Sequence, residues 1–235
     1  MAPPTNDLGQ PIGAALPGWA GCVPPGEAPL IGHYCQIEPI DPERHAESLF
    51  AAYQEDKEGR VWTYMPDGPF DDFATFAAWL SATAVSRDPF HHAIIDRDTG
   101  QALGKAAYLR IDPPNGVIEV GHIAYAPNLQ RSRIATEAMY LMMAQVFDQL
   151  GYRRYEWKCD ALNAASRRAA TRYGFRFDGI FEQAVVYKGR NRDTAWYSIL
   201  DKDWPRVKAA YQAWLDPANF DAEGRQRHAL AAQQK

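Results

Sequence analysis

The stretch Val117 to Ala138, VIEVGHIAYAPNLQRSRIATEA, decides how the rest of the chain is interpreted. It opens with β-branched residues typical of a strand. The strand is broken by Ala-Pro-Asn at 126–128, because proline lacks a backbone donor and asparagine tolerates turns. A cationic loop, Gln-Arg-Ser-Arg at 130–133, then leads into a helical pattern. Since the first turn of a helix has unpaired N–H groups and a dipole that favours negative charge, this loop predicts a site for a phosphate-bearing ligand.

The same loop carries a resemblance to a known family. Its Q-x-x-R-x-A at 130–135 is similar to the pyrophosphate-binding signature Q/R-x-x-G-x-G/A of the GNAT acetyltransferase superfamily. The A-T-E-A at 135–138 is similar to that of the Rim-type branch, which acetylates ribosomal-protein N-termini. Arg133 stands where the signature has its central glycine, so its side chain is expected to supply a contact in place of close backbone approach. The resemblance implies that acetyl-CoA is bound by Ile123, Gln130, Arg131, Ser132, Arg133, Ile134 and Ala135.

Composition excludes several classes of protein. The 235 residues are 46% hydrophobic, as in a globular chain, and are enough for one domain with extra arms. The net charge of −4 gives no support for nucleic-acid binding. The three widely spaced cysteines suggest neither disulfides nor a metal site and fit a reducing compartment. Neither a signal peptide nor a membrane span is visible, so we expect a cytoplasmic protein without a membrane partner, as a monomer or a homodimer.

Three parts of the chain are distinguished by composition. Residues 1–30 are dense in proline and glycine and predict an extended arm, which is either anchored on the domain through Trp19 or a loose leader. Residues 31–200 are the predicted acetyltransferase domain. Residues 201–235 are a C-terminal helix, at 204–215, followed by a polar tail.

Periodicity and turn residues predict the elements between these ends. Strands are expected at 33–40, 92–96, 102–111, from 117, and at 155–159, 175–177, 181–188 and 194–200. Helices are expected at 42–54, 71–85, 132–149 and 163–173. This order resembles that of the GNAT fold, an α/β (α+β) architecture with a mixed central sheet of about seven strands flanked by helices.

Glu119 is the candidate general base. It lies in an otherwise apolar strand, where a carboxylate is costly unless it has a partner or a task, and where desolvation raises its pKa. The E-V-G-H at 119–122 also looks like the family's E-I-G-Y segment, whose Glu is often proposed as the base. A carboxylate paired with a nearby arginine or with backbone donors is an equal alternative. His122 is expected on the opposite face of a regular strand, which a bulge would reverse.

A second segment, D-A-L-N-A-A-S at 160–166, is similar to the family's N-x-x-S…G-F. The resemblance implies that Asn163 binds the pantetheine arm and that Ser166 lies near the sulfur and protonates it. Plain alternatives are a helix N-cap and an exposed hydroxyl. Ala170 occupies the place of the tyrosine that many relatives use as the acid, and Tyr173 does not replace it by spacing. Cys159 is not expected to be a nucleophile, because it ends a buried strand.

The acceptor pocket is expected around Trp62 and Tyr64. Aromatic rings beside the carboxylates of Asp67, Asp71 and Asp72 suit a cationic amine, although a packed loop with a solvated acidic rim explains them equally well. Neighbouring histidines at 91 and 92 lack a third ligand at suitable spacing, so no metal is expected.

These residues predict an acyl-CoA-dependent N-acetyltransferase that transfers an acetyl group directly to a primary amine of a small molecule or a protein N-terminus. Glu119 would act as base and contact the acceptor, and Ser166 would serve the leaving thiolate. The alternative is a GNAT module that binds acyl-CoA as a sensor or with a partner, without turnover. A generic nucleotide-phosphate binder is a weaker reading, because the loop lacks the glycines and lysine of a P-loop.

Overall fold

The computed structural model describes residues 2–232. Its strands are β1 (Leu30–Ile31), β2 (Cys35–Pro39), β3 (Phe90–Asp96), β4 (Ala102–Asp112), β5 (Val117–Tyr125), β6 (Arg154–Asp160), β7 (Arg176–Tyr187) and β8 (Arg190–Leu200). Its α-helices are α1 (Pro42–Tyr53), α2 (Phe73–Ala84), α3 (Arg133–Ala144), α4 (Ala164–Arg172) and α5 (Trp204–Leu215). Short helical turns are η1 (Arg60–Trp62), η2 (Gln145–Gln149), η3 (Asp201–Asp203) and η4 (Pro217–Asn219). The predicted mixed α/β architecture with a C-terminal helix is confirmed.

Local sequence explains where four of these helices begin. Each follows a residue whose side-chain oxygen accepts a hydrogen bond from a backbone N–H of the first turn, which satisfies one of the otherwise unpaired donors. These N-caps are Asp41 for α1, Asp72 for α2, Ser132 for α3 and Asn163 for α4.

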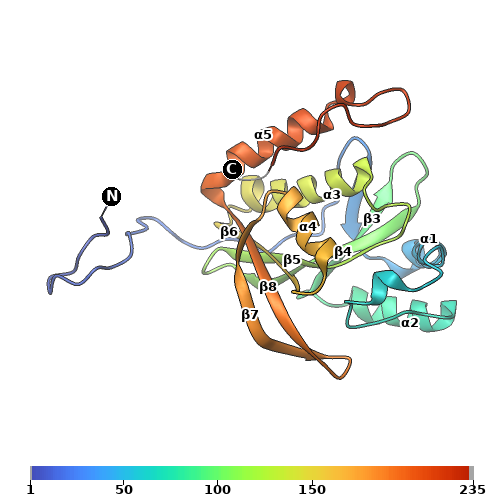
Figure 1. Ribbon diagram of the computed structural model, residues 1–235, viewed down its shortest axis with the longest axis horizontal. Coiled ribbons are helices and arrows are strands. Elements are labelled where there is room, and N and C mark those ends of the chain that lie inside the picture. The colour runs from blue at the N-terminus through green and yellow to red at the C-terminus, as the bar shows by residue number, and fades with distance from the viewer. Residues whose placement is uncertain (1, 233–235) are drawn as a thin grey trace.

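One sheet contains all eight strands, in the order β1-β2-β3-β4-β5-β6-β8-β7. Every neighbouring pair is antiparallel except β5 and β6, which run parallel. A parallel pair needs a crossover connection, and here α3 with the turn of π-helix η2 supplies it. Helices lie on both sides of the sheet, and the tip of the β7–β8 hairpin extends well beyond the other strands (Figure 1). The crossover places the start of α3 directly after the end of β5.

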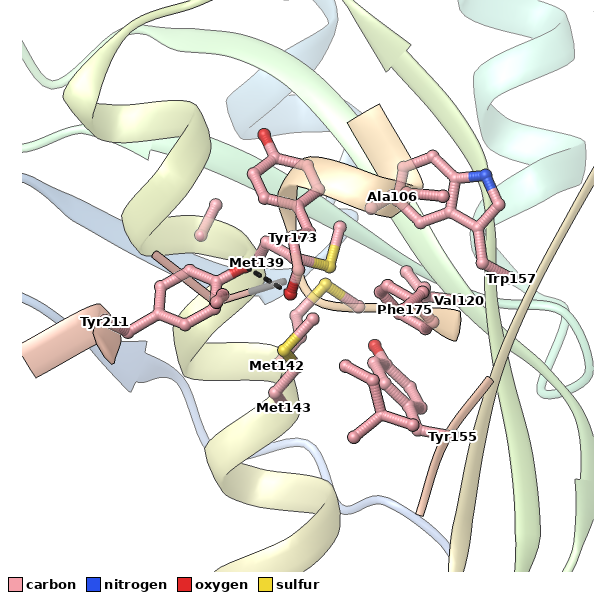
Figure 2. Close-up of a cluster of buried hydrophobic side chains, with 14 of the residues drawn as sticks. Ala106, Val120, Met139, Met142, Met143, Tyr155, Trp157, Tyr173, Phe175 and Tyr211 are labelled. Atoms are coloured by element: carbon pink, nitrogen blue, oxygen red, sulfur yellow. Dashed lines mark hydrogen bonds between the residues drawn. The ribbon is translucent and has the colours of Figure 1, made fainter. Parts of the chain in front are cut away.

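Two hydrophobic cores form on the two faces of the sheet. Helices α3, α4 and α5 cover the larger core, where methionines of α3 pack against aromatic residues of β6 and of the segment after α4 (Figure 2). Helices α1 and α2 cover the smaller core with the loop between them. Its rings form edge-to-face contacts among Tyr53, Trp62, Phe70, Phe76 and Trp79. We call these two sides the α3 face and the α1 face.

The sheet differs from the prediction at two places. The two-residue strand β1 was not predicted, because so short a strand has no periodicity. The segments predicted at 175–177 and 181–188 form one continuous strand, β7. Its pairing with β8 shifts register beside Gly179 and again between Phe181 and Val185, so the apparent breaks are bulges and not strand ends.

Trp19 of the N-terminal arm and the segment after α5 both contact the domain. Trp19 donates its indole N–H to the Pro114 carbonyl at 2.8 Å, and its ring lies 5.3 Å from the Arg153 guanidinium. This contact favours the anchored arm over a loose leader, although residues before it extend away from the domain (Figure 1). The segment after α5 is more than a polar tail, because Leu230 and Ala232 are buried in the larger core. Met1 and residues 233–235 of the predicted arm and tail lie outside the described residues.

Glu137 ties α3 to the start of β2. Its buried carboxylate accepts hydrogen bonds from the backbone N–H groups of His33, Tyr34 and Cys35 at 2.7–2.8 Å. Three backbone donors on one carboxylate fix the position of α3 against the sheet edge. Within residues 2–232, no helix combines the length and the hydropathy that crossing a bilayer requires.

Candidate active site

A gap opens in the middle of the sheet where β5 and β6 part. The two strands pair from Val117 with Arg154 to Val120 with Trp157, and both continue beyond these residues without further pairing to each other. At the same point β5 contains a bulge, in which His122 and Ile123 together face Ala106 of β4. His122 has a φ of 48°, a left-handed conformation that is unusual for a residue other than glycine. Beyond Val120 and Trp157 the two strands are therefore not joined by backbone hydrogen bonds to each other.

The loop that follows β5 presents unpaired backbone donors. The backbone N–H groups of Arg131, Arg133 and Ile134 donate to no other group in the described part of the chain. The N–H of Ala135 is satisfied by the hydroxyl of Ser132 at 3.0 Å, and Arg131 has a φ of 59°. Donors left free at a helix start and beside a left-handed residue have the chemistry to bind an anion. This arrangement fits the predicted pyrophosphate position.

Arg133, which replaces the usual glycine, has an aromatic cage. Its guanidinium carbon lies 4.8 Å from the ring centre of Tyr34 and 4.9 Å from that of Phe220. The side chain is therefore held between the start of β2 and the segment after α5. The two rings bind the Arg133 side chain, while the backbone N–H of Arg133 remains free for a ligand. The side chain of Arg131 is exposed and has no such cage among the described residues.

Asn163 and Ser166 meet the gap from the α3 face. The Asn163 side chain accepts from the N–H of Ser166 at 3.0 Å, so it is a genuine N-cap of α4. The Ser166 hydroxyl accepts a hydrogen bond from the indole N–H of Trp157 at 3.0 Å. Trp157 is the last residue of β6 that pairs with β5. Tyr173 is buried, and its backbone carbonyl accepts from the Tyr211 hydroxyl at 3.2 Å. Gln130 donates to the Tyr125 carbonyl at 2.9 Å and supports the loop.

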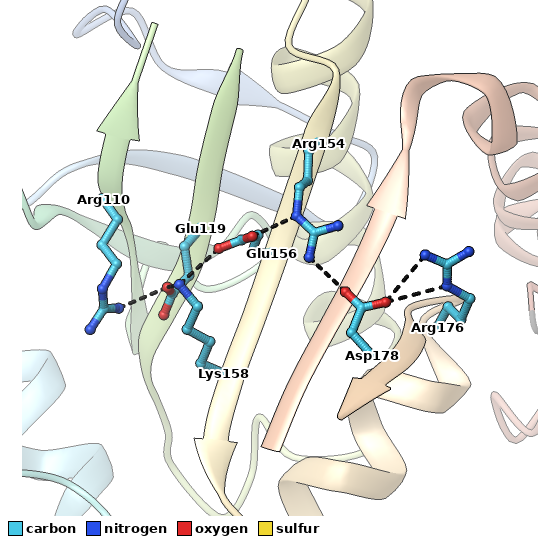
Figure 3. A network of polar contacts seen from close by, with 7 residues as sticks. All are labelled: Arg110, Glu119, Arg154, Glu156, Lys158, Arg176 and Asp178. Atoms are coloured by element: carbon cyan, nitrogen blue, oxygen red, sulfur yellow. Dashed lines mark hydrogen bonds and ion pairs between the residues drawn. The ribbon is translucent and has the colours of Figure 1, made fainter. Parts of the chain in front are cut away.

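Glu119 lies on the α1 face of the gap as part of a chain of ion pairs (Figure 3). Only 3% of its side chain is exposed, and one carboxylate oxygen lies 2.7 Å from Arg110 and 2.8 Å from Lys158. Burial raises the pKa of the Glu119 carboxyl, although both cations act to lower it. The chain continues through Glu156, Arg154 and Asp178 to Arg176. Glu119 is thus a paired carboxylate, and its raised pKa is also compatible with a role as a base.

The predicted acceptor residues are only partly brought together. The ring of Trp62 is 3% exposed and packs in the smaller core, while its carbonyl accepts from Lys188 Nζ at 2.9 Å. Tyr64 is half-buried and donates to the Leu162 carbonyl at 3.3 Å, which links the loop before α2 to the loop after β6. The tip of the β7–β8 hairpin and residues 62–68 therefore border the α1 face of the gap.

Sequence reasoning allowed for an arginine beside Glu119, which is Arg110, and for a bulge that reverses His122, but it did not identify Lys158 or locate the bulge. Lys158 was not singled out, although its place two residues after Glu156 in β6 puts both on the same face as Glu119. The bulge turns His122 onto the α1 face, where its ring centre lies 5.2 Å from that of His91. No feature of the sequence predicts a bulge at that residue. His91 and His92 contact different neighbours, His122 and Tyr108 respectively, and do not form a pair.

Comparison with known proteins identifies the family of this chain. Residues 36–176 match a family model described as an acetyltransferase (GNAT) domain. The matched range contains β5, the anion loop, Asn163 and Ser166, which are the elements around the gap.

Two solved structures have the same fold over most of their length, and a curated relative is similar in sequence. A GCN5-related N-acetyltransferase from Brucella melitensis is 47% identical, with a TM-score of 0.89 over 92% of this chain and 97% of that one. A probable acetyltransferase of the GNAT family from Chromobacterium violaceum is 40% identical, with a TM-score of 0.77 over 83% of this chain and 98% of that one. An uncharacterized N-acetyltransferase of Bacillus subtilis, YnaD, is 24% identical over 66% of this chain and 88% of its own length.

Proposed function

This chain belongs to the GNAT acetyltransferase family, and on that premise we propose that it transfers an acetyl group directly from acetyl-CoA to a primary amine. Family membership makes it an acyl-CoA-dependent acetyltransferase with acetyl-CoA as the co-substrate, in preference to a module without turnover. The observation that supports direct transfer is the gap between β5 and β6, which has Ser166 on one face and Glu119 on the other. Cys159 takes no part, because burial raises the pKa of its thiol and keeps it protonated.

The cofactor is proposed to bind from the α3 face. The free N–H groups of Arg131, Arg133 and Ile134 would receive the pyrophosphate, and the exposed Arg131 side chain would add a charge-assisted contact. The pantetheine arm would then run past Ile123 and Asn163 into the gap. This path ends beside Ser166, where the thioester sulfur would lie.

Two groups are proposed to handle protons at the thioester. Glu119 would remove a proton from the acceptor ammonium group, directly or through an ordered water, because the raised pKa of a buried carboxyl brings it closer to that of an amine. Ser166, oriented by the Trp157 indole, would stabilise and protonate the departing thiolate. In this assignment the Arg110 and Lys158 ion pairs hold the Glu119 carboxylate toward the gap.

The acceptor class is an amine of a small molecule or of a protein N-terminus. The A-T-E-A at 135–138 supports the Rim-type branch, although within this segment Glu137 has the structural task of binding the start of β2. We propose a cytoplasmic location on the basis of the three free cysteines. The half-buried Tyr64 would line the acceptor path with the hairpin tip.

An acceptor screen tests the function. Purified protein is mixed with acetyl-CoA and with members of a panel of amino acids, polyamines, drug-like amines and short peptides, and the release of free thiol is followed. We expect at least one amine to accelerate thiol release and to gain one acetyl group by mass. A protein that binds acetyl-CoA, as judged by a raised melting temperature, but acetylates none of the panel would support the sensor alternative.

A further inference from the structure

A buried lysine without a counter-ion lies on the α1 face of the gap. Lys105 of β4 is 1% exposed, and its Nζ lies 3.4 Å from His91 Nδ1 and 5.0 Å from the ring centre of Trp79. Among residues 2–232, no carboxylate forms an ion pair with it. Because burying an unpaired ammonium group is expensive, a lysine at this position contributes little to stability and calls for a function.

The bulge in β5 connects this lysine to the gap. Lys105 is paired with Ala124, two residues beyond His122, and with Ala93 of β3. The left-handed His122 turns its half-buried ring onto that of His91, which in turn contacts the lysine. His122, His91 and Lys105 therefore form a row of nitrogen bases that begins at the bulge and ends inside the smaller core.

Burial favours the neutral form of all three bases in this row. Burial lowers the pKa of Lys105 to about 7, that of His122 to about 4 and that of His91 to about 2. Charged and titratable groups of the neighbouring elements act electrostatically on the row, and they are Asp67 of the loop before α2, Arg110 of β4, Arg192 of β8 and His92, whose ring contacts Tyr108. Only Asp67 favours protonation among them. Near neutral pH the row is thus able to accept a proton, and the lysine is its strongest base.

We propose that Lys105 is a second proton acceptor of the reaction, reached from the substrate through His122 and His91. This inference rests on the proposed function. An ammonium acceptor must lose two protons to become an amide: one before its nitrogen attacks the thioester carbonyl, and one after the C–N bond has formed. Glu119 takes the first. His122 takes the second and passes it through His91 to Lys105, while the C–S bond breaks and its electron pair leaves with sulfur.

These groups account for every proton of the reaction. The thiolate gains one proton on the Ser166 side, so that free coenzyme A leaves as the thiol. The acceptor gives up two protons in all, one to Glu119 and one to Lys105. One of them balances the proton that the thiol has gained, and the other is released to solvent. The net products are the amide, coenzyme A and one proton. Glu119 and His122 both belong to β5, three residues apart in the chain and next to the point where its pairing with β6 ends.

The test uses Lys105→Met, which keeps the length of the side chain and removes the base, and Lys105→Arg, which keeps the charge but cannot accept a proton. The dependence of kcat/KM on pH is measured with an alkylamine acceptor and with hydroxylamine, which is already neutral at pH 7. Lys208→Met is the matched control, because Lys208 lies on α5, on the other face of the sheet, and pairs with Asp148 of η2. His122→Gln is the second variant if the substitutions at Lys105 prevent folding.

The wild-type rate is expected to decline below about pH 7 with both acceptors, and the Lys105 variants should lose about 100-fold or more with both. A Glu119→Gln variant should be deficient only with the alkylamine, since hydroxylamine needs no first deprotonation. Folded Lys105→Met or His122→Gln protein with the wild-type profile would overturn the proposal, as would a change confined to KM. A wild-type protein that acetylates no amine at all would instead overturn the proposed function.

Discussion

Lys158 Nζ lies 2.8 Å from a carboxylate oxygen of Glu119, at the point where β5 and β6 stop pairing. Lys158 also lies 2.8 Å from Glu156 and 3.8 Å from the ring centre of Trp196. The lysine is thus held by β6 and β8, and it fixes the carboxylate of a third strand. An ion pair of this kind orients a base without needing to stabilise the fold.

Glu119→Gln keeps the shape of the side chain and removes the proton acceptor. For an amine that is charged at neutral pH, kcat/KM should fall by about two to four orders of magnitude. The deficit should shrink as the pH rises toward the pKa of the amine, because the acceptor then arrives neutral. The measurement is kcat/KM against pH, with acetyl-CoA affinity and melting temperature as checks. A wild-type profile in the folded variant would assign the first proton to another group.

Arg131→Ala and Arg133→Ala should have different consequences. Arg131 is exposed beside the free N–H groups, so its loss should weaken acetyl-CoA binding by roughly ten-fold and reduce the salt dependence of binding. Arg133 has cation–π contacts with Tyr34 and Phe220, so its loss should lower the free energy of unfolding by about 1–2 kcal/mol. Calorimetric titration and urea unfolding separate the two effects. Equal losses of affinity with unchanged stability would contradict the cage.

Ser166→Ala should slow turnover more than Tyr173→Phe. The serine hydroxyl is placed beside the gap by the Trp157 indole, whereas the tyrosine is buried under α5. The loss of one proton donor typically costs about 100-fold or more in rate. Single-turnover rates of thiol release measure this step. If Tyr173→Phe proved the slower enzyme while remaining fully folded, the tyrosine would be the acid.

Lys105→Met should change how stability depends on pH. Since burial lowers the pKa of Lys105 from 10.5 to about 7, the unfolded chain binds a proton between these values that the folded chain does not. The wild-type free energy of unfolding therefore gains up to about 1.4 kcal/mol per pH unit across this window as the pH rises. The variant should lack this gain, while the Lys208→Met control keeps it. Parallel curves for wild type and Lys105→Met in urea unfolding between pH 7 and 10 would show that the buried amine is charged.

The helices and most strands were predictable because their signals are local. Asp41, Asp72, Ser132 and Asn163 each mark a helix start by their own chemistry, and α5 was predicted at its observed bounds. Strand β7 was divided in two because a bulge has the same sequence signature as a turn. Nothing within a short window distinguishes Gly179 in a bulge from a glycine at a strand end.

The site was predictable where one segment builds it and not where several strands meet. The anion loop and the cap at Asn163 could be located from contiguous residues. The Lys158 partner of Glu119 depends on the register between β5 and β6, which no local pattern encodes. The row from His122 to Lys105 depends on a single backbone angle in the bulge together with the registers of β3 and β4.

The cage around Arg133 also has a consequence for the order of folding. The arginine at the head of α3 is held by Tyr34, far before it in the chain, and by Phe220, far after it. Contacts of such long sequence separation form late, because the entropy of closing long loops must be offset first. Phe220 is itself part of the larger core, so we expect the loop at 130–133 to become rigid only when the segment after α5 has packed onto that core.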